Sequence, residues 1–67
     1  MAFVQKQKVI DALKNGGQLI YDRIYHIYTV KNESETFKID SHRFLSIRPD
    51  LVRVDSDAMC EYYRLTA

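Results

Sequence analysis

Residues 18–40, QLIYDRIYHIYTVKNESETFKID, constrain the fold of this chain more than any other stretch. They contain three of the five tyrosines together with five β-branched hydrophobic residues. The isoleucines at positions 20, 24 and 27 recur at helical spacing, and so do the tyrosines at positions 21, 25 and 28. Good helix formers are nearly absent between positions 20 and 30, whereas β-branched and aromatic residues suit a pleated surface. Composition therefore favours strands over a helix.

The strand interpretation divides this stretch into three short strands. Asp22 and Arg23 would form a bend or bulge after the first strand, and the polar residues 31–35 would form the loop of a hairpin, because Asn and Ser favour turns. Phe37 and Ile39 alternate with polar neighbours, which indicates one buried and one exposed face. The predicted strands are residues 19–21, 24–30 and 36–39.

The segment before this stretch carries the clearest helix signal, over residues 6–15. Val9, Ile10 and Leu13 recur on one side of the predicted helix, and lysines occupy the other side. Glycine just past a helix supplies the left-handed cap that other residues adopt only at a cost. The sequence Asn-Gly-Gly at residues 15–17 therefore predicts the end of this helix.

A second helix of about two turns is predicted over residues 42–47. Asp40 and Ser41 precede it and are favourable N-caps. Pro49 ends it, because the residue before a proline is pushed out of helical geometry. The side chains expected to face inward are Phe44, Leu45 and Ile47, and those expected to face outward are His42, Arg43 and Ser46.

The C-terminal residues predict a second hairpin with its tip at residues 55–58. Its register stays open, since a three-residue loop would place Val54 beside Cys60, whereas a two- or four-residue loop would place it beside Met59. The arms are Leu51, Val52 and Val54 on one side and residues 59–65 on the other. The fold class is therefore α+β, with an N-terminal helix, a β-hairpin or small antiparallel sheet, a short second helix and a C-terminal β-hairpin. We expect one domain over residues 1–67.

Composition narrows the classes of function. Ten basic and nine acidic residues give a formal net charge of +1, without the basic excess that is common in dedicated nucleic-acid-binding domains. Cys60 is the only cysteine, so an internal disulfide is excluded and a cysteine-rich zinc site is not expected. No hydrophobic run approaches the roughly 20 residues that cross a membrane. We expect a soluble protein of the cytoplasm, with no membrane partner.

The order of elements resembles a winged-helix domain in which a β-hairpin replaces the usual second helix, as in a small bacterial or phage protein. Four segments carry the resemblance: KVIDALKNGGQLIY, DSHRFLSI, LVRVDSD and CEYYRLT. The resemblance implies a DNA-binding transcriptional regulator whose short helix lies in the major groove and whose wing contacts phosphates. The residues that would contact DNA are His42, Arg43, Ser46 and Arg53. Against this interpretation, Asp55 and Asp57 at the wing tip would be repelled by phosphates.

Tyrosines suggest a different function. Five are many for so small a core, and exposed tyrosines are enriched at the hot spots of protein interfaces. The structural alternative is that their rings cover the sheet while their hydroxyls stay in water. We expect a non-enzymatic regulatory or inhibitory module that binds a protein partner, or a second copy of itself as a homodimer, through a tyrosine-rich sheet. The residues assigned to this contact are Tyr21, Tyr25, Tyr28 and Tyr63.

Catalysis is not expected. Cys60 with His26 or His42 could pair as nucleophile and base, but a lone cysteine in a strand is usually a small buried hydrophobe. Asp55 and Asp57 could ligate a metal, but two aspartates at a hairpin tip are usually turn formers. The sequence predicts no catalytic residue, cofactor, metal site or small-molecule substrate.

Overall fold

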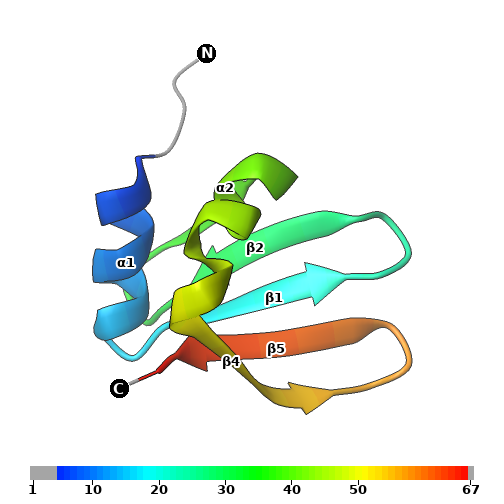
Figure 1. The fold of residues 1–67 in the computed structure, drawn as a ribbon. Coiled ribbons are helices and arrows are strands. Elements are labelled where there is room, and N and C mark those ends of the chain that lie inside the picture. The colour runs from blue at the N-terminus through cyan, green and yellow to red at the C-terminus, as the bar shows by residue number, and fades with distance from the viewer. Residues whose placement is uncertain (1–4, 67) are drawn as a thin grey trace.

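The computed structural model describes residues 5–66, so residues 1–4 and 67 of the predicted domain lie outside this range. The described chain is a mixed α+β fold in which two α-helices pack against strands, as the sequence predicts, together with a short 3-10 helix that it does not predict (Figure 1). No helix in this range is long and apolar enough to span a bilayer. The elements are α1 (Lys6–Lys14), β1 (Gln18–Asp22), β2 (Ile27–Lys31), β3 (Thr36–Ile39), α2 (Ser41–Ile47), η1 (Arg48–Asp50), β4 (Leu51–Ser56) and β5 (Cys60–Leu65).

All five strands form one antiparallel sheet in the order β3-β2-β1-β5-β4. The central strand, β1, pairs with β2 through Leu19 and Val30 and with β5 through Leu19 and Tyr63. The pairing of β1 with β5 joins the two hairpins that the sequence predicts into a single layer. As a result, the turn of the β1–β2 hairpin and the turn of the β4–β5 hairpin lie at the same end of the sheet (Figure 1).

The hydrophobic core lies between the helices and one face of the sheet. Alternation along each strand sends Leu19 and Tyr63 to this face and leaves their sequence neighbours on the other. No element of residues 5–66 covers the opposite face, which we call the open face. The buried core residues are Val9, Ala12, Leu13, Leu19, Val30, Ile39, Phe44, Ile47, Leu51 and Tyr63.

Two glycines end α1 for different reasons. Gly16 has a φ of 78°, the left-handed conformation that the sequence predicts for the cap. Gly17 has no such torsion, but a Cβ atom there would lie 2.4 Å from the carbonyl oxygen of Ala12. The second glycine therefore allows a close approach between the helix end and the start of β1.

Helix α2 begins as predicted, with the Asp40 side chain accepting a hydrogen bond of 2.7 Å from the backbone N–H of Arg43. Phe44 and Ile47 are buried, but the prediction that Leu45 faces inward is wrong, because Leu45 is 67% exposed. A helix turns about 100° per residue, so Phe44 and Ile47 share the face toward the sheet and Leu45 turns away. Past Ile47 the chain continues as η1, which contains Pro49. Arg48 has φ −52° and ψ −40°, so the expectation that the residue before Pro49 leaves helical geometry is wrong; the proline lies at the start of the 3-10 helix instead.

Residues 18–40 form strands and not a helix, but the first turn lies later than predicted. The bend expected at residues 22 and 23 is instead a turn over residues 23–26, and β2 begins at Ile27. The prediction that residues 24–26 belong to a strand is therefore wrong. Ile24 and Tyr25 lie in the turn and are exposed.

The C-terminal hairpin contains an irregularity that neither predicted register includes. The pairing shifts between Arg53 and Asp55, so that Val54 lies in a β-bulge. Val52 lies opposite Arg64, and Val54 lies opposite neither Cys60 nor Met59. Since a bulge inserts one residue into only one strand, counting loop residues from the sequence leads to the wrong partners.

Candidate protein-binding surface

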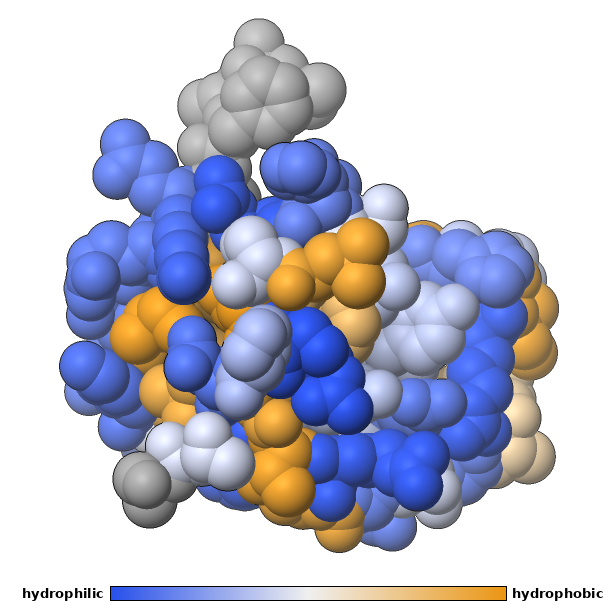
Figure 2. Space-filling model, in the orientation of Figure 1, coloured by the Kyte–Doolittle hydropathy of each residue, from blue (hydrophilic) through white to orange (hydrophobic). Residues whose placement is uncertain are grey.

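Three large hydrophobic side chains are exposed at the end of the sheet where both hairpin turns lie. Ile24 is 54% exposed and Tyr25 72% exposed in the first turn, and Met59 is 51% exposed in the second. Figure 2 shows hydrophobic surface at the right-hand edge of the molecule, where Figure 1 places the two turns. We call Ile24, Tyr25 and Met59 the hairpin-tip surface.

Each turn is held by an aspartate that precedes it. The Asp22 Oδ1 atom accepts hydrogen bonds from the backbone N–H groups of Ile24 and Tyr25, at 2.8 and 3.0 Å. The Asp57 Oδ1 atom accepts equivalent bonds from Met59 and Cys60, at 2.9 and 2.7 Å. These two backbone donors hold the pKa of the Asp57 carboxyl below its usual range, so the carboxylate keeps accepting both bonds to a lower pH than an ordinary aspartate would.

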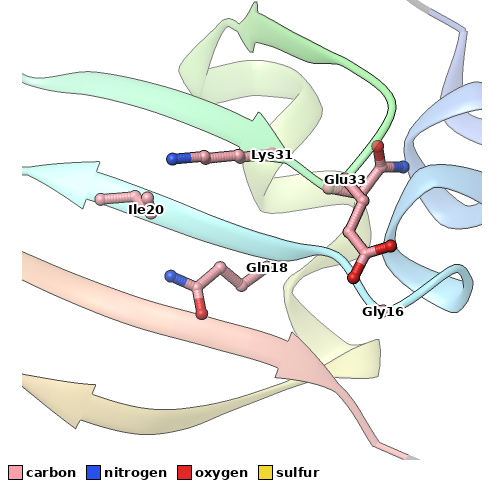
Figure 3. A pocket seen from close by; sticks show the side chains of 6 residues that line it. Gly16, Gln18, Ile20, Lys31 and Glu33 are labelled. Atoms are coloured by element: carbon pink, nitrogen blue, oxygen red, sulfur yellow. The ribbon is translucent and has the colours of Figure 1, made fainter.

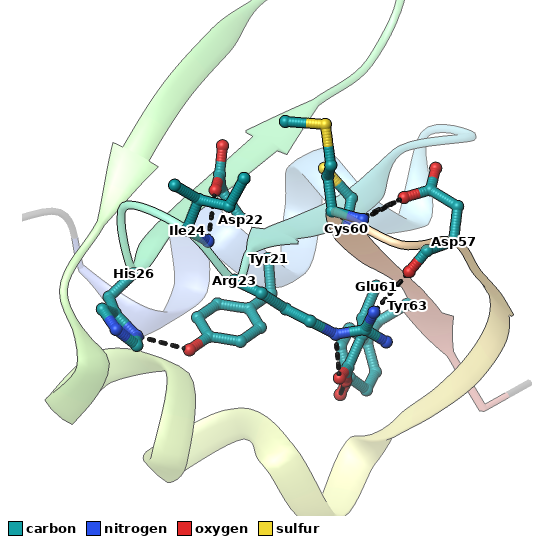
Figure 4. A network of polar contacts seen from close by, with 10 residues as sticks. Tyr21, Asp22, Arg23, Ile24, His26, Asp57, Cys60, Glu61 and Tyr63 are labelled. Carbon is teal, nitrogen blue, oxygen red and sulfur yellow. Dashed lines mark hydrogen bonds and ion pairs between the residues drawn. The ribbon is translucent and has the colours of Figure 1, made fainter.

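Arg23 connects the two turns (Figure 4). Its backbone N–H donates to the carbonyl oxygen of Met59 at 2.8 Å, and its Nη1 atom donates to the carbonyl oxygen of Asp57. Its Nε atom forms an ion pair with Glu61 Oε2 at 3.1 Å. Arg23 therefore holds the two turns together, although they lie far apart in the sequence. The side chains of the hairpin-tip surface lie on these joined turns.

Behind the turns lies an aromatic cluster on the helix-covered face. The ring centroids of Tyr21 and Tyr28 are 4.6 Å apart, those of Tyr28 and Phe44 4.4 Å, and those of Phe44 and Tyr63 5.5 Å. Tyr63 is only 6% exposed, and burial raises the pKa of both Tyr28 and Tyr63. Of the four tyrosines assigned to a contact surface, three thus pack together beneath α2, and Tyr25 lies apart from them in the turn.

Polar groups attach this cluster to the turns. The Tyr63 hydroxyl donates to Glu61, which together with Arg23 lowers the pKa of that carboxyl. The Tyr21 hydroxyl lies 2.8 Å from His26 Nδ1. His26 has a φ of 56°, a conformation that non-glycine residues adopt at a cost.

Charge is unevenly distributed between the turn end and the rest of the molecule. Four carboxylates surround the hairpin-tip surface with one arginine among them, a formal charge of −3, whereas the whole chain carries +1. The remainder of the chain accordingly carries +4. The charged residues of the turn end are Asp22, Arg23, Asp55, Asp57 and Glu61.

The residues assigned to DNA contact lie on the helix-covered side. His42 and Ser46 are exposed on α2, and Arg43 is half-buried. The Ser46 hydroxyl donates to the carbonyl oxygen of Arg43 at 2.8 Å, within the helix. Arg53 lies on the edge strand β4 opposite Tyr63. These residues share one side of the molecule.

The candidate nucleophile and base do not meet. Cys60 pairs with Asp22 on the open face of the sheet, whereas His26 contacts Tyr21 on the other side. Figure 4 shows Cys60 and His26 well apart.

Sequence reasoning missed Ile24 and Met59 as surface residues. The signal lay in the aspartates at positions 22 and 57, each followed two residues later by a hydrophobic residue. An aspartate that accepts backbone N–H groups two and three residues on makes a tight turn, and a hydrophobic residue in such a turn has no core to enter.

Comparisons of the chain with protein-family models, with curated proteins and with solved structures return no significant match.

Proposed function

We propose that this protein is a small non-enzymatic binding module, regulatory or inhibitory in role, that contacts a protein partner through the hairpin-tip surface. The observation that carries this proposal is that Ile24, Tyr25 and Met59 are exposed on two turns that are capped and connected. A mobile loop loses conformational freedom when it binds, whereas a fixed turn has little left to lose. Rigid hydrophobic anchors of this kind, with tyrosine prominent among them, dominate the energetics of many interfaces.

The charges around the hairpin-tip surface indicate the chemistry of the partner. A net charge of −3 at this end favours a partner that offers an apolar depression with basic residues around it. Complementary charges speed association and exclude wrong partners more than they add affinity. Added salt should therefore slow association while leaving dissociation nearly unchanged.

The tyrosines take separate roles in this proposal. Tyr25, at 72% exposure, contacts the partner directly. Tyr21, Tyr28 and Tyr63 support the turns from behind through ring packing and hydroxyl contacts. Substituting Tyr63 would therefore weaken binding only by loosening the fold.

The test is capture of a partner from lysate, treated with and without nuclease, followed by titration of the captured protein. Tyr25→Ala should weaken its affinity about 30-fold, the effect of losing a hot-spot residue worth about 2 kcal/mol. Leu45→Ala is the matched control, because Leu45 is similarly exposed but lies on α2. Capture that is equal for both variants would overturn the proposal.

Duplex DNA binding through α2 is the weaker candidate. The resemblance to winged-helix domains and the exposed His42 on α2 favour it. Asp55 and Asp57 at the wing tip oppose it, because DNA phosphates would repel their carboxylates. DNA binding that weakens steeply with salt and is lost in Arg43→Ala would establish this alternative and remove the protein-partner proposal.

A further inference from the structure

The open face of the sheet carries a diagonal apolar stripe with one side chain from each of four neighbouring strands. Ile20 lies opposite Tyr62, Ile27 lies opposite Asp22, and Val52 lies opposite Arg64. Since paired residues point to the same side, all of these side chains lie on the open face. The stripe consists of Ile27 on β2, Ile20 on β1, Tyr62 on β5 and Val52 on β4.

Charges of opposite sign lie on the two sides of this stripe. The basic side is formed by Lys31, Lys38 and Arg64, and the acidic side by Asp22, Asp55 and Asp57. Asp57 belongs here because its Oδ2 atom accepts a hydrogen bond of 3.1 Å from the Tyr62 hydroxyl. Figure 3 shows Ile20 and Lys31 side by side on the open face, where they line a shallow depression together with Gln18.

We infer that a second copy of the chain packs on this face, with the two apolar stripes in contact. A two-fold axis along the stripe places the basic side of each copy over the acidic side of the other. Such an interface is self-complementary, as the contact in a two-fold dimer must be. A two-fold axis across the stripe would instead place like charges over one another, so the charge pattern selects the first arrangement.

Because the stripe runs diagonally across the strands, the two sheets would cross at a steep angle, close to the orthogonal class of sheet packing. The strands lie about 4.8 Å apart and rise about 3.3 Å per residue, so five short strands present a face of roughly 400 Å². A stable interface buries about 800 Å² on each partner. The dimer is therefore weak and reversible, with monomer and dimer exchanging at micromolar concentrations or above.

The hydrophobic side chains of the two proposals differ, because Ile24, Tyr25 and Met59 lie on the turns and the stripe lies on the strands. The two surfaces share the carboxylates of Asp22, Asp55 and Asp57, so the dimer would compete with the partner for these charges. A small domain gains stability from such a contact, since a 67-residue chain buries comparatively little surface on its own.

The test is sedimentation equilibrium over a wide concentration range with a charge swap. Arg64→Glu and Asp55→Lys should each weaken dimerisation about tenfold, and the double variant should restore it, since the two-fold axis along the stripe places position 64 of one copy over position 55 of the other. Lys14→Glu is the control, because it makes the same charge change at an exposed position on α1. Far-UV circular dichroism verifies that each variant is folded.

A protein that stays monomeric at millimolar concentration would overturn the inference. So would a dimer that the two single variants leave unchanged, or that the double variant fails to restore.

Discussion

Truncating the side chain of Phe44 should strongly lower the free energy of unfolding and leave the exposed surface of the protein almost unchanged. Phe44 is only 8% exposed. The centroid of its ring lies 4.4 Å from that of Tyr28 and 5.5 Å from that of Tyr63. Truncating a buried phenylalanine to alanine costs about 3–5 kcal/mol. At about 0.05–0.15 kcal/mol per residue, a 67-residue domain has roughly 3–10 kcal/mol in total. Phe44→Ala should therefore remove between a third and all of the free energy of unfolding.

The neighbouring residue provides the control. Leu45 is 67% exposed, so Leu45→Ala should change the free energy of unfolding by no more than about 0.5 kcal/mol. Urea denaturation followed by far-UV circular dichroism measures both variants. The chain has no tryptophan, so near-UV dichroism reports on its tyrosines and thereby on the aromatic cluster. Equal losses in the two variants, or a greater loss in Leu45→Ala, would refute the inferred orientation of α2.

Three further predictions concern the helix end and the turns. Gly17→Ala should destabilise the protein more than Gly16→Ala does. A Cβ at position 17 would lie 2.4 Å from the Ala12 carbonyl oxygen. At position 16 the added Cβ meets no atom, and alanine costs only about 1–2 kcal/mol for adopting the left-handed conformation. Thermal melting of both variants would measure the difference, and the reverse order would contradict the account. Asp57 has a folded-state pKa below its usual value, so its contribution to stability is complete above about pH 4 and is lost as pH falls through the folded-state pKa. Asp57→Asn should accordingly lose less stability than wild type in urea titrations as the pH is lowered from about 5 to about 2. Equal losses in the two proteins would contradict the hydrogen bonds assigned to Asp57. Arg23→Ala should lower the free energy of unfolding by only about 1 kcal/mol, because the ion pair with Glu61 is partly exposed to solvent. It should also speed hydrogen exchange at the amides of both turns. Unchanged exchange would show that other contacts hold the turns.

Features that depend on neighbours in sequence were predictable. Adjacent glycines marked the end of α1, Asp40 capped α2 through a carboxylate that accepts the Arg43 N–H, and β-branched composition identified strands in residues 18–40. In each case the physical cause lies within a few residues of its effect. The α+β fold class follows from these local signals.

Pairing between distant strands was beyond the reach of such signals. β1 lies between β2 and β5, and only a contact between residues about 40 apart, such as Leu19 and Tyr63, makes one sheet of two hairpins. The bulge at Val54 adjusts the edge strand to this sheet and leaves no signature in the alternation of residues 51–56. These features are set by long-range packing rather than by local preference.

The candidate site was predicted in part. Tyrosines were identified as the notable residues, but the alternation that sends Tyr21 and Tyr28 to one face does not say which face the helices cover. The β-branched side chain of Ile24 predicts a strand, whereas the Asp22 carboxylate accepts the backbone N–H of Ile24 and places this residue in a turn. A search for aspartates that precede hydrophobic residues in hairpin loops would have found both turns.

The most direct test of the proposed function is a photo-crosslinker placed at single positions of the surface in cells. A benzophenone side chain at position 25 lies within the hairpin-tip surface, and the same group at position 45 lies on the exposed side of α2. The proposal predicts a crosslinked protein of one defined mass from position 25 and none from position 45. Crosslinks to that protein from position 45 but not from position 25 would contradict it.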